Sequence, residues 1–171
     1  MKKRRFFALF LVLGLLVSLL SVPASAFEEI DVDARAALLV EKETGEILYE
    51  KNAHEKNYPA SITKLTVALL VFEAIDAGQL SLDQPITAHE SAFEGLSIYG
   101  STAGIKVGEV LTVEQLLQCM LIVSANEACN ILAEAVCGEG NISQFVQSMN
   151  ERAAALGCEN THYVNTSGLH D

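Results

Sequence analysis

Ser61 and Lys64 are separated by two residues in the sequence YPASITKL, at the start of an apolar run. On a helix, residues i and i+3 lie on one face with Cβ atoms about 5–6 Å apart, so the serine hydroxyl and the lysine amine can meet. Serine is a weak nucleophile that needs a base, and lysine can be that base where apolar neighbours such as Ile62 and Leu65 lower its pKa. The spacing therefore indicates an activated serine at a helix N-terminus, whose backbone N–H groups can also hold an oxyanion. On S-x-x-K alone, an N-cap serine and a lysine that reaches solvent are the favoured alternative, because the pattern is short and common.

A second polar group, Ser124-Ala125-Asn126, interrupts an apolar helical pattern far downstream of Ser61. It lies between LLQCMLIV and EACNILAEAV, where polar side chains contribute little to packing. Because a buried polar group must be hydrogen-bonded or used, one interpretation of the triplet is a functional role. Taken by itself, the triplet slightly favours the alternative, an ordinary helix N-cap at Ser124 or Asn126.

S-x-x-K with S-D-N and K-T-G is the signature of penicillin-binding proteins and class A β-lactamases. In this chain the middle motif is S-A-N, which keeps the serine and the asparagine. The chain resembles the serine D-alanyl-D-alanine carboxypeptidases, the low-molecular-weight penicillin-binding proteins of peptidase family S11. The stretches that carry the resemblance are LLVEKETGEILYEKN, YPASITKL, GSTAGIKVGEVLTVEQLL, LIVSANEACNILAEAV and LGCENTHYVNTSGLHD. The resemblance implies an α/β fold of the α+β type, an αβα sandwich of the β-lactamase/DD-peptidase-like transpeptidase kind.

The resemblance also implies a role for each polar residue of the two motifs. Ser61 would be the nucleophile that forms the acyl-enzyme, and Lys64 would be its general base. Ser124 would pass a proton toward the leaving D-alanine, and Asn126 would hydrogen-bond the amide backbone of the substrate. The implied partners are peptidoglycan stem peptides and β-lactam antibiotics, with no cofactor and no metal.

The third family motif, K-T-G, is absent, since Glu43-Thr44-Gly45 lacks the lysine and precedes Ser61. In the family this segment forms one wall of the site, supplies a cation for the substrate carboxylate and helps complete the oxyanion hole. We therefore expect it beyond Asp171, with the 171 residues forming the N-terminal portion of a domain that is incomplete at its C-terminus. By themselves these residues are expected to carry half a site and to be inactive.

Three other functions are consistent with part of this pattern. Class A β-lactamases activate water with a glutamate in E-x-x-L-N, a pattern that Glu159-Asn160 does not match. A DD-endopeptidase of the same fold shares the motifs. A non-catalytic penicillin-recognising or cell-wall-binding protein agrees with the missing K-T-G, but not with intact S-x-x-K and S-x-N motifs.

Residues 1–26 are typical of a secretory signal peptide, with basic Lys2-Lys3-Arg4-Arg5, apolar Phe6–Leu20 and the cleavage pattern Ala24-Ser25-Ala26. The alternative, a transmembrane anchor, is disfavoured because the apolar core is short for a span. Cleavage removes four basic and no acidic residues, which leaves 7 of the 11 Lys and Arg against 22 Asp and Glu, a net charge of −15. That charge argues against nucleic acid and anionic lipid as partners. We expect residues 27–171 to be exported, to the extracytoplasmic face of the membrane, the periplasm or the cell wall.

Turn residues and apolar periodicity predict the elements that must position these side chains. Residues 35–51 read as a β-hairpin with Gly45 in its turn, and residues 91–108 as a loop that can hold a short strand at 104–107. Helices are predicted over residues 61–77, 111–122, 127–136 and 142–156, bounded by Gly78, a Thr112–Gln115 capping box, Asn141 and Gly157.

The cysteines form an even set, which permits disulfides in an exported chain. Three of them fall within apolar helical patterns, and none has the spacing of a metal site. This arrangement favours small buried side chains over disulfides. The four residues are Cys119, Cys129, Cys137 and Cys158.

The signal-peptide pattern predicts that the exported protein begins at Phe27, because cleavage follows the small residue at position 26. N-terminal sequencing of the secreted product measures this directly. A product that still begins at Met1 contradicts the prediction.

Overall fold

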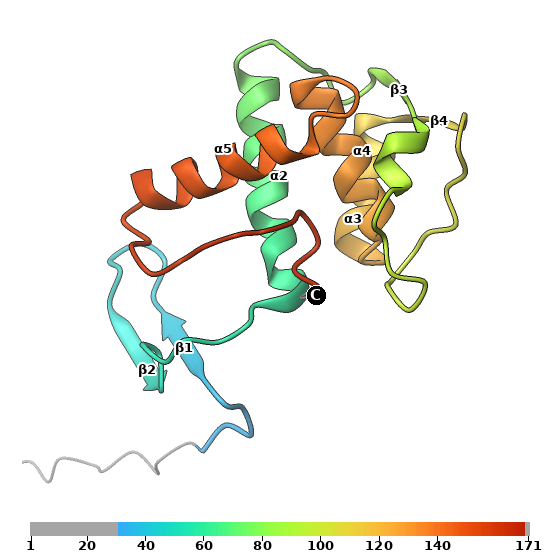
Figure 1. Ribbon diagram of the computed structural model, residues 1–171. Helices are drawn as coiled ribbons and strands as arrows, with labels where there is room; N and C mark the ends of the chain where they lie inside the picture. The colour runs from blue at the N-terminus through green and yellow to red at the C-terminus, as the bar shows by residue number, and fades with distance from the viewer. Residues whose placement is uncertain (1–30, 170–171) are drawn as a thin grey trace, which may run out of the picture. The chain divides into compact units, whose positions relative to one another are not determined.

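The computed structural model describes residues 31–169, which form two units with their boundary between Glu55 and Lys56 (Figure 1). The predicted signal peptide, residues 1–26, lies outside the described residues. Among residues 31–169, no helix is both long and apolar enough to cross a membrane.

The first unit is the predicted hairpin, in which β1 (Ala37–Val40) pairs antiparallel with β2 (Ile47–Lys51). The turn is closed by the Glu41 carboxylate, which accepts the backbone N–H of Thr44 at 2.6 Å and its hydroxyl at 2.6 Å. Gly45 has φ +74°, a left-handed conformation that glycine adopts without strain. The prediction of a hairpin with glycine in the turn is therefore confirmed.

The two strands of the hairpin are apolar on both of their faces. Leu38, Leu39, Ile47 and Leu48 are each more than half exposed, and no residue of the hairpin is buried. Two strands alone are marginal in water, and apolar side chains on both faces are typical of a strand that is covered on both sides.

The second unit consists of helices with one small sheet (Figure 1). Its elements in chain order are η1 (Ala60–Thr63), α2 (Lys64–Asp76), β3 (Pro85–Thr87), η2 (Glu90–Phe93), β4 (Val110–Thr112), α3 (Val113–Ile122), α4 (Asn126–Cys137) and α5 (Ile142–Ala155).

Most of the predicted helices are present with small changes at their ends. The region 61–77 begins as the 3₁₀ turn η1 and continues as α2, and Gly78, with φ +72°, follows its end. The capping box is confirmed, because the Thr112 hydroxyl accepts from Gln115 N at 3.2 Å while Gln115 Oε1 accepts from Thr112 N at 2.9 Å. Asn141 precedes α5 as expected, but its side chain donates to the Cys137 carbonyl at 3.1 Å and makes no capping bond.

The predicted strand at 104–107 is wrong. Gly104 and Gly108 both have positive φ, +77° and +83°, so the chain turns at each of them and cannot stay extended. The strand instead lies at β4, where Ile86 of β3 is paired with Leu111. This pairing also explains why the following helix begins at Val113 and not at Leu111, since Leu111 belongs to the strand.

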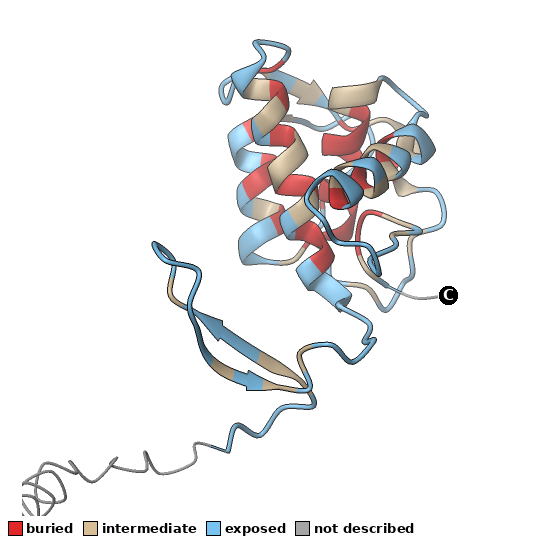
Figure 2. Ribbon diagram, turned by 90° about the vertical axis from the view of Figure 1, so that its left-hand side faces the viewer, coloured by how far each residue is buried: buried red, intermediate tan, exposed pale blue. Residues whose placement is uncertain are grey.

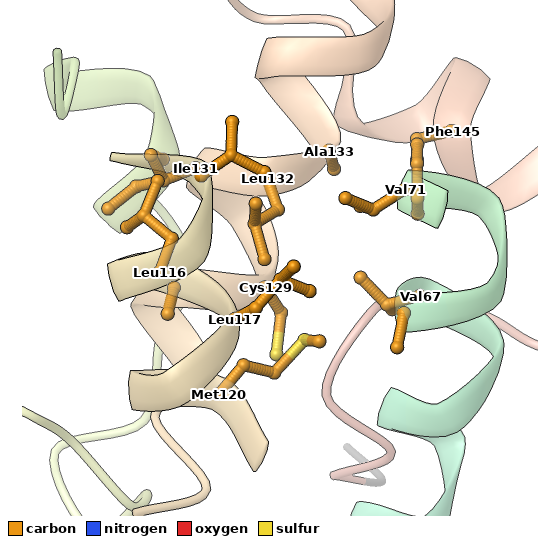
Figure 3. Close-up of a cluster of buried hydrophobic side chains, with 14 of the residues drawn as sticks. Val67, Val71, Leu116, Leu117, Met120, Cys129, Ile131, Leu132, Ala133 and Phe145 are labelled. Atoms are coloured by element: carbon orange, nitrogen blue, oxygen red, sulfur yellow. The ribbon is translucent and has the colours of Figure 1, made fainter. Parts of the chain in front are cut away.

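Helix α4 lies at the centre of the second unit. Residues 126–134 are buried without interruption, which requires cover on every side of the helix. Figure 2 shows that the buried residues gather where the helices of this unit face one another, and Figure 3 shows side chains of α2, α3 and α5 meeting those of α4. The main contributors are Val67, Val71, Leu116, Leu117, Met120, Cys129, Ile131, Leu132, Ala133 and Phe145. The close packing of this core fixes the N-terminus of α4, which carries Asn126.

The cysteines differ in their environments, and all four are free thiols. Cys129 is fully buried, Cys119 and Cys137 are half-buried, and Cys158 is exposed. The expectation of small buried side chains is therefore correct for Cys129 and wrong for Cys158, which follows the glycine that ends α5.

Candidate active site

Ser61 lies on an exposed turn directly before a buried helix start. It belongs to η1, and Ala60 in front of it has φ +48°, a left-handed conformation that is unusual for a residue with a side chain. Helix α2 begins at Lys64, whose side chain turns inward and is only 2% exposed. An accessible hydroxyl therefore lies beside a buried amine.

The buried amine of Lys64 has hydrogen-bond acceptors from three residues. Lys64 Nζ donates to the Ser124 carbonyl at 2.7 Å, to Ser124 Oγ at 2.8 Å and to Asn126 Oδ1 at 2.7 Å. Ser61 Oγ is also in range, at 3.4 Å. The four residues predicted from the two motifs thus lie together, although they come from distant parts of the chain.

Burial lowers the pKa of Lys64 below its ordinary value, because the ammonium form loses hydration, while electrostatic interactions with the titratable groups of Cys129 and Glu127 act in the opposite direction. A lowered pKa makes the neutral amine, the form that can act as a base, more accessible.

Ser124 joins α3 to α4 in a strained backbone conformation. Its φ of +63° is left-handed, which costs a residue with a side chain about 1–2 kcal/mol. The conformation presents both the carbonyl and the hydroxyl of Ser124 to Lys64. The same hydroxyl donates to Ser61 Oγ at 3.0 Å, so it connects the exposed serine to the buried amine. Strained residues of this kind concentrate at functional sites.

Asn126 is the first residue of α4 and is only 4% exposed. Besides accepting from Lys64, it donates its backbone N–H to the Ser101 carbonyl at 2.9 Å. A Cβ atom on Gly100 would overlap Asn126 Nδ2, so any larger residue there would force the asparagine side chain to shift. The asparagine is therefore held between α2 and the loop before β4.

The turn at residues 165–168 packs against η1. Asn165 Oδ1 accepts the backbone N–H groups of Ser167 at 3.2 Å and Gly168 at 2.7 Å, which closes the turn. Gly168 lies so close to Ala60 that a Cβ atom would collide with the Ala60 carbonyl and with Thr63 Oγ1. The position of the serine turn therefore depends on a segment more than a hundred residues away in the sequence.

A buried hydrogen-bond chain ties the same segment to the core. Thr166 Oγ1 donates to Asn130 Oδ1 at 2.6 Å, and Asn130 Nδ2 donates to the Ala92 carbonyl at 2.9 Å. Thr166 and Asn130 are 1% and 7% exposed, so these bonds form away from water. Sequence reasoning missed this support, because nothing in NTSGL alone indicates which helix it touches.

A cavity of about 780 Å³ lies beside this chain, lined by Asn130, Thr166 and residues of η2 and α5. Its lining does not include Ser61, Lys64, Ser124 or Asn126. The chemistry of the candidate site therefore rests on the hydrogen-bonded cluster and not on this cavity. Within residues 31–169, no three His, Cys, Asp or Glu side chains are placed to hold a metal ion.

The family model described as D-alanyl-D-alanine carboxypeptidase, peptidase S11, matches residues 23–171. The chain therefore belongs to this family. It is 35% identical over 161 residues to D-alanyl-D-alanine carboxypeptidase DacF of Bacillus subtilis (strain 168), an alignment that covers 90% of this chain and 40% of the relative. The chain thus spans about two fifths of the length of that relative.

Solved structures of the same kind are similar over most of the chain. The D-alanyl-D-alanine carboxypeptidase DacD from Francisella tularensis is 36% identical with a TM-score of 0.76, over 84% of this chain and 34% of that one. Penicillin-Binding Protein D2 from Listeria monocytogenes, in its ampicillin-bound form, is 31% identical with a TM-score of 0.70, over 85% of this chain and 56% of that one. These likenesses confirm the predicted fold class.

Replacing Gly168 with alanine tests whether the 165–168 turn fixes the serine turn. We expect Gly168→Ala to lower the free energy of unfolding by about 1–3 kcal/mol more than Gly157→Ala, because overpacking is added to backbone strain. Gly157 is the matched control, since its φ is also left-handed at +81° but no atom lies within 4 Å of an added Cβ. Urea unfolding of the full-length variants measures the difference, and equal losses contradict the argument.

Proposed function

We propose that the protein is a serine-type D-Ala-D-Ala carboxypeptidase that removes the terminal D-alanine from peptidoglycan stem peptides through an acyl-enzyme. The observation that carries the proposal is the buried Lys64 amine, hydrogen-bonded to Ser124 and Asn126 and within 3.4 Å of the exposed Ser61 hydroxyl. Membership of the carboxypeptidase family supports it.

In this proposal Ser61 Oγ attacks the carbonyl carbon between the two D-alanines. The serine proton passes to neutral Lys64, either directly or through Ser124 Oγ, whose contacts of 2.8 and 3.0 Å are shorter than the direct 3.4 Å. The C–N bond then breaks, and the leaving amine takes the proton back from Lys64 by way of Ser124. Water hydrolyses the Ser61 ester and restores the serine.

Asn126 is proposed to orient the substrate. Its Oδ1 is engaged by Lys64, which leaves the Nδ2 hydrogens to donate to a backbone carbonyl of the stem peptide. A β-lactam presents a carbonyl and an amide in a similar arrangement and would acylate the same serine. The expected place of action is the extracytoplasmic side of the membrane, where peptidoglycan is found.

Penicillin labelling of the full-length protein is expected to acylate Ser61 and no other serine, because among the serines of residues 31–169 Ser61 alone combines exposure with contacts to Ser124 and Lys64. Peptide mass spectrometry after labelling identifies the site. Ser61→Ala should abolish the adduct, whereas Ser124→Ala should slow its formation without moving it. An adduct on Ser124 overturns the assigned roles, and rapid release of hydrolysed penicillin indicates a β-lactamase.

Lys64→Ala is expected to slow acylation by about 10²-fold or more, the usual contribution of a general base. The wild-type rate should rise with pH as Lys64 loses its proton, and this rise should begin below the ordinary pKa of lysine. Lys106→Ala is the control, because Lys106 is exposed and its backbone N–H donates to Glu109, outside the cluster. An unchanged rate or pH profile in Lys64→Ala would falsify the role of Lys64 as base.

A further inference from the structure

Glu127 is a buried carboxylate with no part in the proposed chemistry. It follows Asn126 in the first turn of α4 and is only 3% exposed. Removing a carboxylate from water is unfavourable unless strong hydrogen bonds replace its hydration. Such a group therefore needs an identifiable partner.

The partner of Glu127 is the loop that precedes β4. Glu127 Oε1 accepts the Thr102 hydroxyl at 2.7 Å, the Ala103 N–H at 2.7 Å and the Gly104 N–H at 3.1 Å. The loop has no helix or strand at these positions, and its residues are exposed. Bonds to an ionised acceptor are about twice as strong as neutral ones, so the carboxylate is a strong anchor for this segment.

The anchored segment also touches Asn126. The Ser101 carbonyl accepts the Asn126 backbone N–H at 2.9 Å, and Gly100 lies against Asn126 Nδ2. Two consecutive residues of α4 therefore hold one loop segment, Glu127 through its side chain and Asn126 through its backbone. Movement of the segment would remove the contacts that Gly100 and Ser101 make with Asn126.

We propose that Glu127 is a positioning residue of this site: its carboxylate fastens residues 100–104 to α4 and thereby holds Asn126 against Lys64. The proposal rests on the proposed carboxypeptidase function for its effect on rate. The structural part, the fastening of the loop, is independent of that function.

The charge of Glu127 also acts on Lys64. Within the described residues, the titratable groups whose charges act on Lys64 are Cys129 and Glu127, both on α4, and Glu127 in turn acts on Cys119 of α3. Burial raises the pKa of the Cys129 thiol to about 12, so this thiol is uncharged at neutral pH. Glu127 is then the negative group that keeps the pKa of Lys64 from falling further.

The test compares Glu127→Gln and Glu127→Ala with Glu134→Gln in the full-length protein. Glu134 is the matched control, because it is also buried on α4 at 5% exposure but accepts a single backbone N–H, from Gly140 at 2.9 Å.

Glu127→Ala should reduce the rate of penicillin acylation by roughly 10- to 100-fold, the effect of a small misplacement at a reacting centre. Glu127→Gln keeps the size of the side chain and removes its charge, so the rise of rate with pH should move to lower pH. Glu134→Gln should change neither the rate of penicillin acylation nor its pH dependence.

Hydrogen exchange supplies a readout that needs no activity. The amide of Ala103 should exchange at least about tenfold faster in Glu127→Ala than in Glu134→Gln, because only the former removes its acceptor. The Gly104 N–H is a weaker reporter, since it also donates to Thr102 Oγ1 at 2.8 Å. If the wild type does not acylate, the proposed function fails, while exchange still decides whether Glu127 fastens the loop. Unchanged exchange in Glu127→Ala, or equal effects in Glu134→Gln, overturns the proposal.

Discussion

The burial of one amine is the constraint on which the arrangement of the second unit depends. Lys64 is 2% exposed, so its ammonium form must find oxygen atoms inside the protein. The turn before helix α2 provides one oxygen acceptor, the hydroxyl of Ser61, and the other acceptors come from Ser124 and Asn126. The junction between α3 and α4 must therefore lie against the start of α2, and the left-handed backbone of Ser124 allows it to do so.

The stability of this junction comes from packing that is remote from the chemistry. Helix α4 is buried along residues 126–134, and its apolar neighbours on α2, α3 and α5 keep it in place (Figure 3). The turn at 165–168 fixes the serine from the other side, by close approach to Ala60. The polar residues of the site are therefore held by two packed segments: helix α4 positions Ser124, and the turn at 165–168 positions Ser61.

The sequence predicted the residues proposed to carry the chemistry better than the contacts that hold them in place. Ser61 and Lys64 share a helical face, so local spacing was sufficient to pair them, and the capping box at Thr112 is equally local. The left-handed conformations of Ala60 and Ser124 could not be predicted, because the residue types do not require them and long-range contacts impose them. The position of β4 was missed for the same reason, since its pairing with β3 joins segments separated by more than twenty residues.

The acceptors of Lys64 are of two chemical kinds, and the difference orients the amine. The Ser124 carbonyl and Asn126 Oδ1, both at 2.7 Å, can only accept hydrogen bonds, whereas the hydroxyls of Ser61 and Ser124 can also donate. A neutral amine has two hydrogens and one lone pair. The two hydrogens are retained by the oxygens that cannot donate, so the lone pair is left facing the hydroxyls. The oxygens that bind the ammonium form of Lys64 therefore also orient the neutral amine, with its lone pair toward the hydroxyl proton that it has to accept.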